Sequence, residues 1–250
     1  MPLRRSLLAL AALALLAAPV AAEDGPCRAL TYGGKAFTVC TADLRHDTIR
    51  LFWKGADGEA LGSFARLREM PEGGRLTFAM NAGMYRPDLS PAGLYVENGR
   101  EWVRVNTANG PGNFHMKPNG IFYVDKDGAA IVETGRYLRL RAQPGFRPEL
   151  ATQSGPMLVI AGRLHPKISE SGTSAKMRNG VGVQDRGTAV FAISEEPVTF
   201  GEFAHLFRDA LHCPDALFLD GSISALYAPT LGRTDSLRPL GPIVGVLPRE

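Results

Sequence analysis

Five short motifs hold the residues of this sequence that could carry chemistry. Each places polar side chains beside a glycine at the edge of an apolar run, and together they offer a carboxylate, two cations and several amide or hydroxyl groups. A single motif of this kind is typical of a turn, where Asn, Asp, Ser and Gly are favoured for local reasons. Five of them fit a polar pocket at strand ends better than five separate turns, and the mixture suits a phosphate-bearing, hydroxyl-rich ligand. The candidate residues are Asn81, Lys117, Asn119, Gln153, Ser154, Arg178, Asn179, Asp220, Ser222 and Ser224.

Sequence patterns of several other enzyme classes are missing. The five histidines are scattered, without the His-Glu-x-x-His pattern of a zinc site. Ser154 lacks the glycine two positions earlier that a nucleophile elbow needs, and the segment 180–182 lacks the third glycine of a dinucleotide fingerprint. The interpretation therefore includes no cofactor and no metal ligand, and it leaves a metal requirement of any reaction open.

Turn signals between apolar runs indicate the strands that must position these motifs. Asn98-Gly99 suits a type I′ turn and therefore predicts a hairpin. Similar signals predict further hairpins, and the full set covers 96–103, 122–132, 157–162 and 181–193. Cys27 and Cys40 flank a further pair of expected strands joined at Gly33-Gly34.

Helix signals are fewer. Thr199-Phe200-Gly201-Glu202 forms a capping box, which predicts a helix that ends before Pro214 and leads into a strand over 216–219. A second helix is expected around 61–70. No internal repeat or Pro/Gly-rich linker divides the chain. The pattern predicts an α+β fold, with a mixed, hairpin-rich β-sheet and a few packed helices in a single domain over residues 23–250.

The first 22 residues are typical of a signal peptide. Arg4 and Arg5 precede an apolar run over 7–18, and small residues precede Glu23. The run is shorter than the roughly 20 residues that span a bilayer, so an uncleaved anchor helix is the weaker alternative. We expect a periplasmic or secreted mature chain with no stable membrane insertion.

The charge of the mature chain gives no reason to expect a nucleic-acid partner. The whole sequence has 28 Lys and Arg against 25 Asp and Glu, and removal of Arg4 and Arg5 leaves 26 against 25, or +1. A chain this close to neutral has no electrostatic case for binding nucleic acid or an anionic membrane. The sequence leaves the oligomeric state open.

Cys27 and Cys40 are predicted to form a disulfide. The paired strands expected around Gly33-Gly34 would bring them within bridging distance, and an oxidising compartment would preserve the bond. The alternative is a pair of free, buried thiols. Cys213, which precedes an apolar strand, is expected to be a buried thiol rather than a nucleophile, because no basic neighbour in the sequence suggests a lowered pKa.

Four of the motifs resemble, in the same order, those of the phosphodiester glycosidase family. They are Asn81-Ala82-Gly83-Met84-Tyr85, the segment 153–159, Arg178-Asn179-Gly180-Val181-Gly182 and Leu219-Asp220-Gly221-Ser222-Ile223-Ser224, and the likeness spans roughly residues 75 to 248. The resemblance implies a mixed α/β domain that hydrolyses a sugar-1-phosphodiester. It implies Asp220, Arg178 and Asn81 as site residues, with Ser222, Ser224 and Gln153 beside them. Ser222 and Ile223 stand where family members commonly have glycines, and Ala82 replaces another, so the substrate stays open.

The chemistry of such a reaction suggests a role for each candidate. Arg178 would form paired hydrogen bonds to phosphate oxygens, and Lys117 would add a point charge. Asp220 would lie near the anomeric carbon as base, nucleophile or electrostatic stabiliser, and Glu195 is the second carboxylate that many glycosidases need, unless it is a solvated turn residue. The remaining candidates, led by Asn81 and Asn119, would bind sugar hydroxyls.

The sequence thus predicts an exported hydrolase that cleaves a sugar-1-phosphodiester in an envelope glycan or a related substrate. The alternative is a non-catalytic periplasmic binding protein for a phosphorylated glycan, with the same pocket. The sugar, the group beyond the phosphate and the stereochemical outcome stay open.

Overall fold

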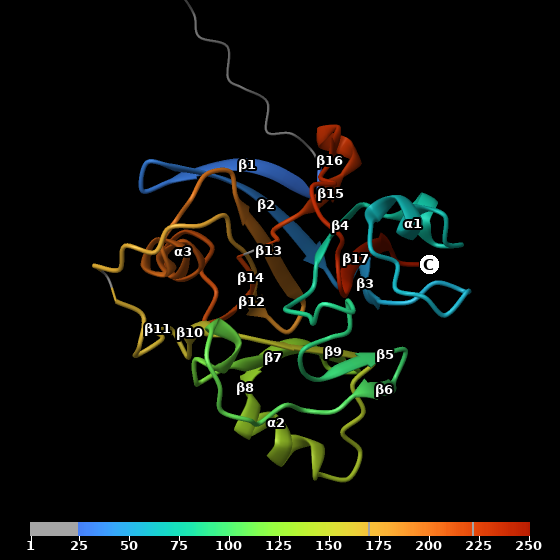
Figure 1. Cartoon of the computed structure of the whole chain (residues 1–250), viewed down its shortest axis with the longest axis horizontal. Coiled ribbons are helices and arrows are strands. Elements are labelled where there is room, and N and C mark those ends of the chain that lie inside the picture. Colours follow the sequence, from blue (N-terminus) through green and yellow to red (C-terminus); the bar gives the residue numbers. More distant parts are fainter. Residues whose placement is uncertain (1–24, 170, 222) are drawn as a thin grey trace, which may run out of the picture.

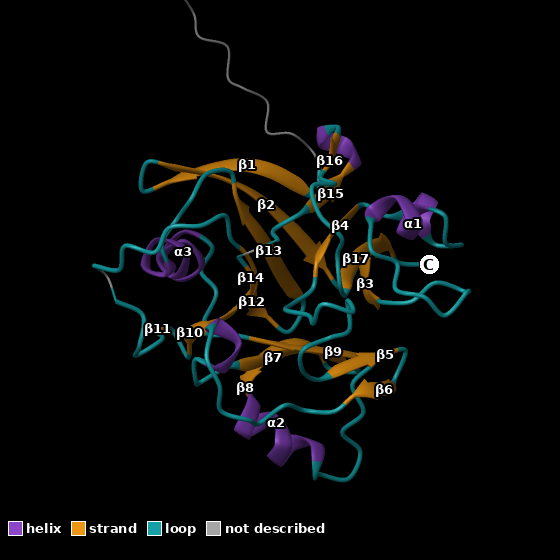
Figure 2. Cartoon of the chain, viewed as in Figure 1, coloured by secondary structure: helices purple, strands orange, loops and turns teal. Residues whose placement is uncertain are grey.

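The computed structural model describes residues 25–169, 171–221 and 223–250. In this part of the chain three sheets meet around a common core, with a few short helices on the outside (Figure 1, Figure 2). The predicted signal peptide over 1–22 and the candidate Ser222 lie outside the described residues. No helix in the described ranges is long and apolar enough to cross a membrane.

The strands of each sheet come from distant parts of the chain. The seven-stranded sheet has the order β1 (Cys27–Tyr32), β2 (Lys35–Asp43), β13 (Thr188–Ser194), β12 (Asn179–Asp185), β14 (Asp215–Asp220), β10 (Met157–Ile160) and β11 (Arg163–Leu164). The second sheet has the order β16 (Arg233–Thr234), β15 (Leu226–Ala228), β4 (Phe78–Asn81), β17 (Ile243–Pro248) and β3 (Asp47–Phe52). The third has the order β6 (Arg100–Val103), β5 (Tyr95–Glu97), β9 (Leu150–Ser154), β7 (Gly120–Asp125) and β8 (Gly128–Glu133).

The helices are short and begin where local signals allow. The capping box at Thr199 is present and opens α3 (Phe200–His205), which continues as a π-helical turn over Leu206–Ala210. The helix expected around 61–70 is α1 (Phe64–Arg68), capped by Ser63. The helix α2 (Thr134–Arg141) was not predicted, and its N-cap Glu133 makes no capping hydrogen bond. The shortest turns are 3₁₀ helices at Gly73–Arg75, Asn113–His115 and Pro229–Leu231.

The observed fold is a sheet-rich α+β fold. Antiparallel pairs join β5 to β6, β7 to β8, β10 to β11 and β12 to β13, so the four hairpins predicted from turn signals are confirmed. At least one antiparallel or mixed sheet was expected; every strand pair in the described residues is antiparallel, and the strands divide into three sheets. Short turns join only antiparallel neighbours, and the sequence could not show which distant strands pair.

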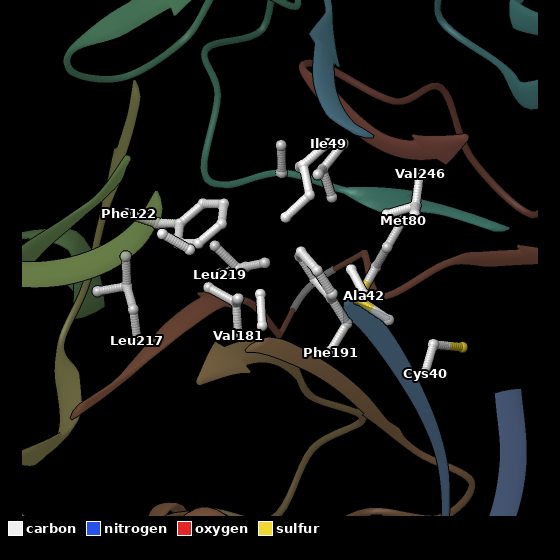
Figure 3. Close-up of a cluster of buried hydrophobic side chains, with 14 of the residues drawn as sticks. Cys40, Ala42, Ile49, Met80, Phe122, Val181, Phe191, Leu217, Leu219 and Val246 are labelled. Carbon is white, nitrogen blue, oxygen red and sulfur yellow. The ribbon is translucent and has the colours of Figure 1, made fainter. Parts of the chain in front are cut away.

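Phe191 of β13 lies at the centre of the core where the three sheets meet (Figure 3). Its ring contacts Phe78 of the second sheet and Phe122 of the third edge-on, with centroid distances of 5.5 and 5.9 Å. Figure 3 shows Met80 and Val246 of the second sheet approaching the same core. These contacts fix the second sheet against the face of the first sheet that carries the candidate site.

The other face of the first sheet packs against α3 and its π-helical turn. Gly180 and Gly182 of β12 let these segments approach, because a Cβ at Gly182 would lie 2.7 Å from Phe207 and 2.6 Å from the Cys213 sulfur. The glycines of the Arg178–Gly182 motif therefore have a packing role. Cys213 is buried there, and burial raises the pKa of its thiol to about 12, as expected for a buried thiol.

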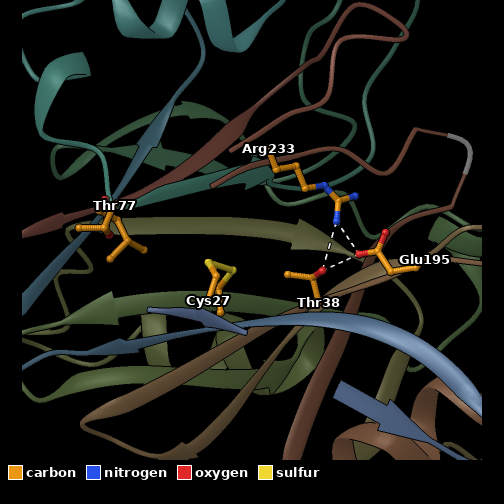
Figure 4. The surroundings of a disulfide bond; sticks show 7 residues. Cys27, Thr38, Thr77, Glu195 and Arg233 are labelled. Atoms are coloured by element: carbon orange, nitrogen blue, oxygen red, sulfur yellow. Dashed lines mark hydrogen bonds and ion pairs between the residues drawn. A yellow bond between two sulfur atoms is a disulfide. The ribbon is translucent and has the colours of Figure 1, made fainter. Parts of the chain in front are cut away.

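Cys27 and Cys40 are directly opposite each other on β1 and β2 and form the predicted disulfide (Figure 4). The bond fastens the edge strand β1 to β2. Thr38, two residues before Cys40 on β2, belongs to the candidate site described below.

Replacing both Cys27 and Cys40 with Ala should lower the free energy of unfolding by about 3 kcal/mol, because the disulfide closes a loop of 13 positions and restricts the unfolded chain. Urea unfolding of the oxidised protein and of the double variant measures the difference. Wild-type protein kept reduced, without alkylation, is the control and should match the variant. Equal stability of the oxidised protein and the variant would contradict the assignment.

Candidate active site

A row of directly paired residues crosses four strands of the first sheet. The successive Cα partners are Thr38 on β2, Ile193 on β13, Asn179 on β12 and Asp220 on β14. Side chains of directly opposed residues lie on the same face of a sheet. Asn179 contacts Asn81 of β4, so this face is the one turned towards the second sheet.

A β-bulge places Asp220 in this row. Asn179 pairs with Asp220 while Gly180 pairs with Phe218, which leaves Leu219 as an extra residue on β14. In a regular strand Asp220 would share the face of Phe218, whose ring packs on Phe200 of α3 at 4.8 Å. The extra residue instead brings Asp220 into register with Asn179, as bulges commonly do near functional sites. Asp220 is 7% exposed.

Asn81 and Asn179 hold the segment that follows Asp220. The Nδ2 of Asn81 donates to the Oδ1 of Asn179 (3.3 Å), and the Nδ2 of Asn179 donates to the carbonyl of Asn81 (3.0 Å). The same Oδ1 of Asn179 accepts from the backbone N–H of Asp220, and the Oδ1 of Asn81 accepts from that of Ala225. Both amides are buried and engaged, so in this structure they position the backbone at Asp220 and at Ala225. Ser224 adds a hydroxyl that donates to the Asp220 carbonyl at 3.2 Å.

Arg178 is a buried cation directly beside this segment. Its guanidinium carbon lies 3.7 Å from the Phe200 ring centroid and 5.3 Å from that of Phe218. Burial lowers the pKa of Arg178 to about 10, so the side chain stays charged at neutral pH. Nε and Nη2 donate to the carbonyls of Val198 and Ser174, both at 2.8 Å.

Of the three guanidinium nitrogens of Arg178, Nη1 alone lacks a hydrogen-bond partner among the described residues. It is directed towards Gly221, where an added Cβ would lie 3.5 Å away. The expected two-pronged contact of Arg178 with a phosphate is therefore not arranged in this structure. The structure arranges a single N–H group of Arg178, directed towards Gly221, the residue after Asp220.

Glu195 lies at an exposed bend directly after β13 and takes part in an ion-pair network. Its Oε1 accepts from the hydroxyl of Thr38 at 2.6 Å and from the guanidinium of Arg233 (Figure 4). Its backbone N–H donates to Ala36 of β2, next to the pair of hydrogen bonds that joins Ser194 to Arg178. Glu195 thus follows the strand beside Arg178, at the same end of the sheet as Asp220. The sequence had no signal for Thr38 or Arg233, because neither is near Glu195 along the chain.

The remaining candidates lie on the third sheet. Ser154 ends β9 and its hydroxyl donates to the Leu219 carbonyl at 2.8 Å, so it contacts the bulge next to Asp220. Gln153 is buried, and its amide is engaged with the backbone of Leu94 and Asn106. Asn119 is buried and bonded to Phe114 and Thr134.

Lys117 and Asn119 line a pocket of about 460 Å³ that the sequence did not predict. Thr107, Glu133, Thr134 and Leu138 complete most of its wall, while Asp220, Arg178 and Glu195 do not line it. The Lys117 ammonium donates to the Thr107 carbonyl and to Asn109, both at 2.8 Å. The structure therefore divides the candidates into a group around Asp220 and a group around this pocket.

Tyr85 is a further residue of the site that the sequence analysis did not select. Its hydroxyl donates to the Pro239 carbonyl at 2.7 Å, and its ring packs flat against Gly241. Burial and then the negative charge of Asp220 raise the pKa of Tyr85 to about 12, against the opposing charge of Arg238. No group of three or more His, Cys, Asp or Glu side chains suited to a metal ion occurs within the described ranges.

The sequence model of one family, described as phosphodiester glycosidase, matches residues 74–247. The chain belongs to the phosphodiester glycosidase family. The matched range agrees with the 75–248 predicted from the motifs. An Escherichia coli K12 protein, the uncharacterized protein YigE, is 38% identical over 226 residues, which are 90% of this chain and 85% of that protein.

Two solved structures share the fold. The catalytic domain of zebrafish N-acetylglucosamine-1-phosphodiester α-N-acetylglucosaminidase, in a form auto-inhibited by its pro-peptide, superimposes with a TM-score of 0.62 at 13% identity, over 89% of this chain and 82% of that domain. A putative exported protein of Burkholderia pseudomallei K96243 gives a TM-score of 0.57 at 12% identity, over 86% of this chain and 74% of that protein.

Asn179→Asp should lower the free energy of unfolding by about 2 kcal/mol, because the new carboxylate oxygen would face the carbonyl of Asn81 in place of the buried Nδ2 donor. Urea unfolding measures the change. Asn109→Asp is the matched control, since Asn109 is exposed and uses only its Oδ1 as an acceptor for Lys117. Similar stability of the two variants would show that the Asn81–Asn179 pair does not hold the segment.

Proposed function

We propose that this protein is an exported hydrolase that cleaves the bond between an anomeric carbon and a phosphodiester oxygen. The observation that carries the proposal is the row that ends at Asp220, with Glu195 bonded to Thr38 of the same row and Nη1 of Arg178 directed towards Gly221. Membership of the family supports the reaction class. The proposed substrate is a sugar-1-phosphodiester of an envelope glycan or a related molecule.

Phosphate is a good leaving group, which simplifies the chemistry that these residues must perform. Phosphate departs as a stabilised anion, so the site must mainly position the diester and stabilise an oxocarbenium-like transition state. In the proposed step, a water oxygen bonds to the anomeric carbon and gives its proton to Glu195. The bond from that carbon to the bridging oxygen breaks, and its electron pair leaves with the phosphate. Asp220 stabilises the positive charge that develops on the sugar.

In this proposal the phosphate binds near Gly221, towards which Nη1 of Arg178 directs an N–H group that has no partner among the described residues. Ile223, which replaces a family glycine, does not obstruct this placement. Ile223 packs against the hydrophobic cluster that contains Phe64 and Tyr227, away from Asp220.

The spacing of the strands favours inversion of the anomeric centre. Glu195 follows β13 and Asp220 ends β14, and β12 lies between them. Neighbouring strands are roughly 4.8 Å apart, so the two strands are separated by about 10 Å, and the Glu195 carboxylate turns towards Thr38 of β2, away from β14. Inverting glycosidases keep their carboxyl groups roughly 6.5–9.5 Å apart to admit a water molecule, whereas retaining enzymes need about 5 Å.

Export is supported by three observations. The first 22 residues have the composition of a signal peptide, the disulfide between Cys27 and Cys40 suits an oxidising compartment, and a structural neighbour is a putative exported protein. These favour a periplasmic or secreted enzyme.

Asp220→Asn should reduce turnover at least ~100-fold with little change in fold, because the substitution keeps size but removes the charge that stabilises the transition state. The test incubates the mature chain with p-nitrophenyl diesters of sugar 1-phosphates and with UDP-N-acetylglucosamine, and measures free sugar. In ¹⁸O-water the phosphate product should carry no label. The matched control is Asp215→Asn, at the opposite end of β14.

Label in the phosphate product would reveal attack at phosphorus and contradict the proposal. Near-normal turnover by Asp220→Asn would show that Asp220 is only a turn residue. If the wild type cleaves no member of the panel while Asp220→Asn abolishes binding of the sugar phosphodiesters, the protein is the non-catalytic binding protein.

A further inference from the structure

We propose that Arg233 is the positioning residue of Glu195, and that it holds this carboxylate towards the proposed sugar site. The inference rests on the function proposed above. Arg233 lies on β16, at the edge of the second sheet, and reaches across to the first sheet (Figure 4).

The guanidinium of Arg233 is clamped between two carboxylates. Nε donates to both oxygens of Asp235 at 3.1 Å, and Nη2 donates to Oδ2 of Asp235 at 2.8 Å. Nη1 donates to Oε1 of Glu195 and to the Thr38 hydroxyl, the latter at 3.3 Å. A fork held in this way fixes the plane of the guanidinium, so the direction of the Nη1 hydrogens is fixed as well.

Asp235 anchors this clamp to the same strands that hold Asp220. Its Oδ2 accepts from the backbone N–H of Leu226 at 2.9 Å, and its own N–H donates to the Leu226 carbonyl. Leu226 begins β15 directly after Ala225, whose N–H is held by Asn81. One edge of the second sheet therefore positions both carboxylates. It acts on Asp220 through Asn81 and Asn179. It acts on Glu195 through Asp235 and Arg233.

The clamp leaves one oxygen of Glu195 available. Oε1 accepts both hydrogen bonds, and no described residue donates to Oε2. The Glu195 side chain is 35% exposed, against 19% for Arg233. Burial opposes the charge of Arg233, but hydrogen bonds to Asp235 and Glu195 outweigh it and raise the pKa of Arg233. The guanidinium therefore fixes Oε1 and leaves Oε2 as the oxygen that would accept a proton from an attacking water.

Arg233 could instead serve only to stabilise the fold, since the same contacts connect the β15–β16 hairpin to β2. The two roles differ in kinetics. A residue that acts only through Glu195 loses its effect once Glu195 is neutralised, so the effects of the two substitutions do not multiply. A residue that only supports the fold lowers the melting temperature and leaves kcat of the folded protein unchanged.

The experiment measures kcat, KM and melting temperature for Arg233→Gln, Glu195→Gln and the double variant, on a sugar-1-phosphate p-nitrophenyl diester that the wild type hydrolyses. Each single substitution should lower kcat by about 30- to 100-fold with KM within about threefold of wild type. The double variant should be no slower than Glu195→Gln. The matched control is Arg186→Gln, which removes another ion pair between sheets, with Asp125, and should leave kcat unchanged.

Arg233→Lys covers the case in which Arg233→Gln does not fold. Lysine keeps the charge but cannot bind Asp235 and Glu195 with a planar fork, so kcat should still fall about tenfold. A kcat within twofold of wild type in the folded Arg233 variants, or multiplicative losses in the double variant, would overturn the inference and leave the proposed function standing. Absence of sugar release by the wild type would overturn both.

Discussion

The register between β12 and β14 is the constraint on which the proposed site depends. Because Leu219 is an extra residue, Asp220 is paired with Asn179 and faces the second sheet instead of α3. The adjoining pairs of Asn179 with Ile193 and of Ile193 with Thr38 extend the row to the position where Glu195 is held. A shift of one residue would move each side chain to the opposite face.

The second sheet keeps this register from changing. Asn81 ends β4 and is 98 positions from Asn179, yet their two amides are buried against each other and fix the backbone at both ends of the 220–225 segment. On the opposite side, Gly180 and Gly182 let α3 pack closely, and Arg178 is held between Phe200 and Phe218. The result is a strand end that carries the Asp220 carboxylate on one face, with the buried Arg178 of the other face directed towards Gly221.

Local signals were sufficient for much of the fold. The Asn98-Gly99 turn, the capping box at Thr199 and the cysteines around Gly33-Gly34 are each decided by neighbours in the chain, and each is present. The helix α2 was not predicted because its N-terminus has no capping side chain. The division into three sheets was also missed, since it follows from pairings between distant strands.

The site was harder to predict, for the same reason. The sequence identified polar residues at strand ends, but their partners are distant in the chain: Arg233 for Glu195, Thr134 for Asn119, and Ser174 and Val198 for Arg178. Only these contacts show which polar groups hold the backbone and which face the space beside Asp220. The family resemblance supplied the order of the motifs but not this distinction.

The central claim is that Asp220 and Glu195 act from strands separated by β12. Its most direct measurement is the configuration of the first-formed sugar. Proton NMR in the first minutes of hydrolysis of an α-linked sugar-1-phosphodiester, before the product mutarotates, resolves the two anomers. The account predicts the β-anomer, with inversion, because strands separated by β12 keep the two carboxylates further apart than the about 5 Å of a retaining enzyme. First-formed α-anomer would contradict it, since retention needs two carboxyl groups about 5 Å apart.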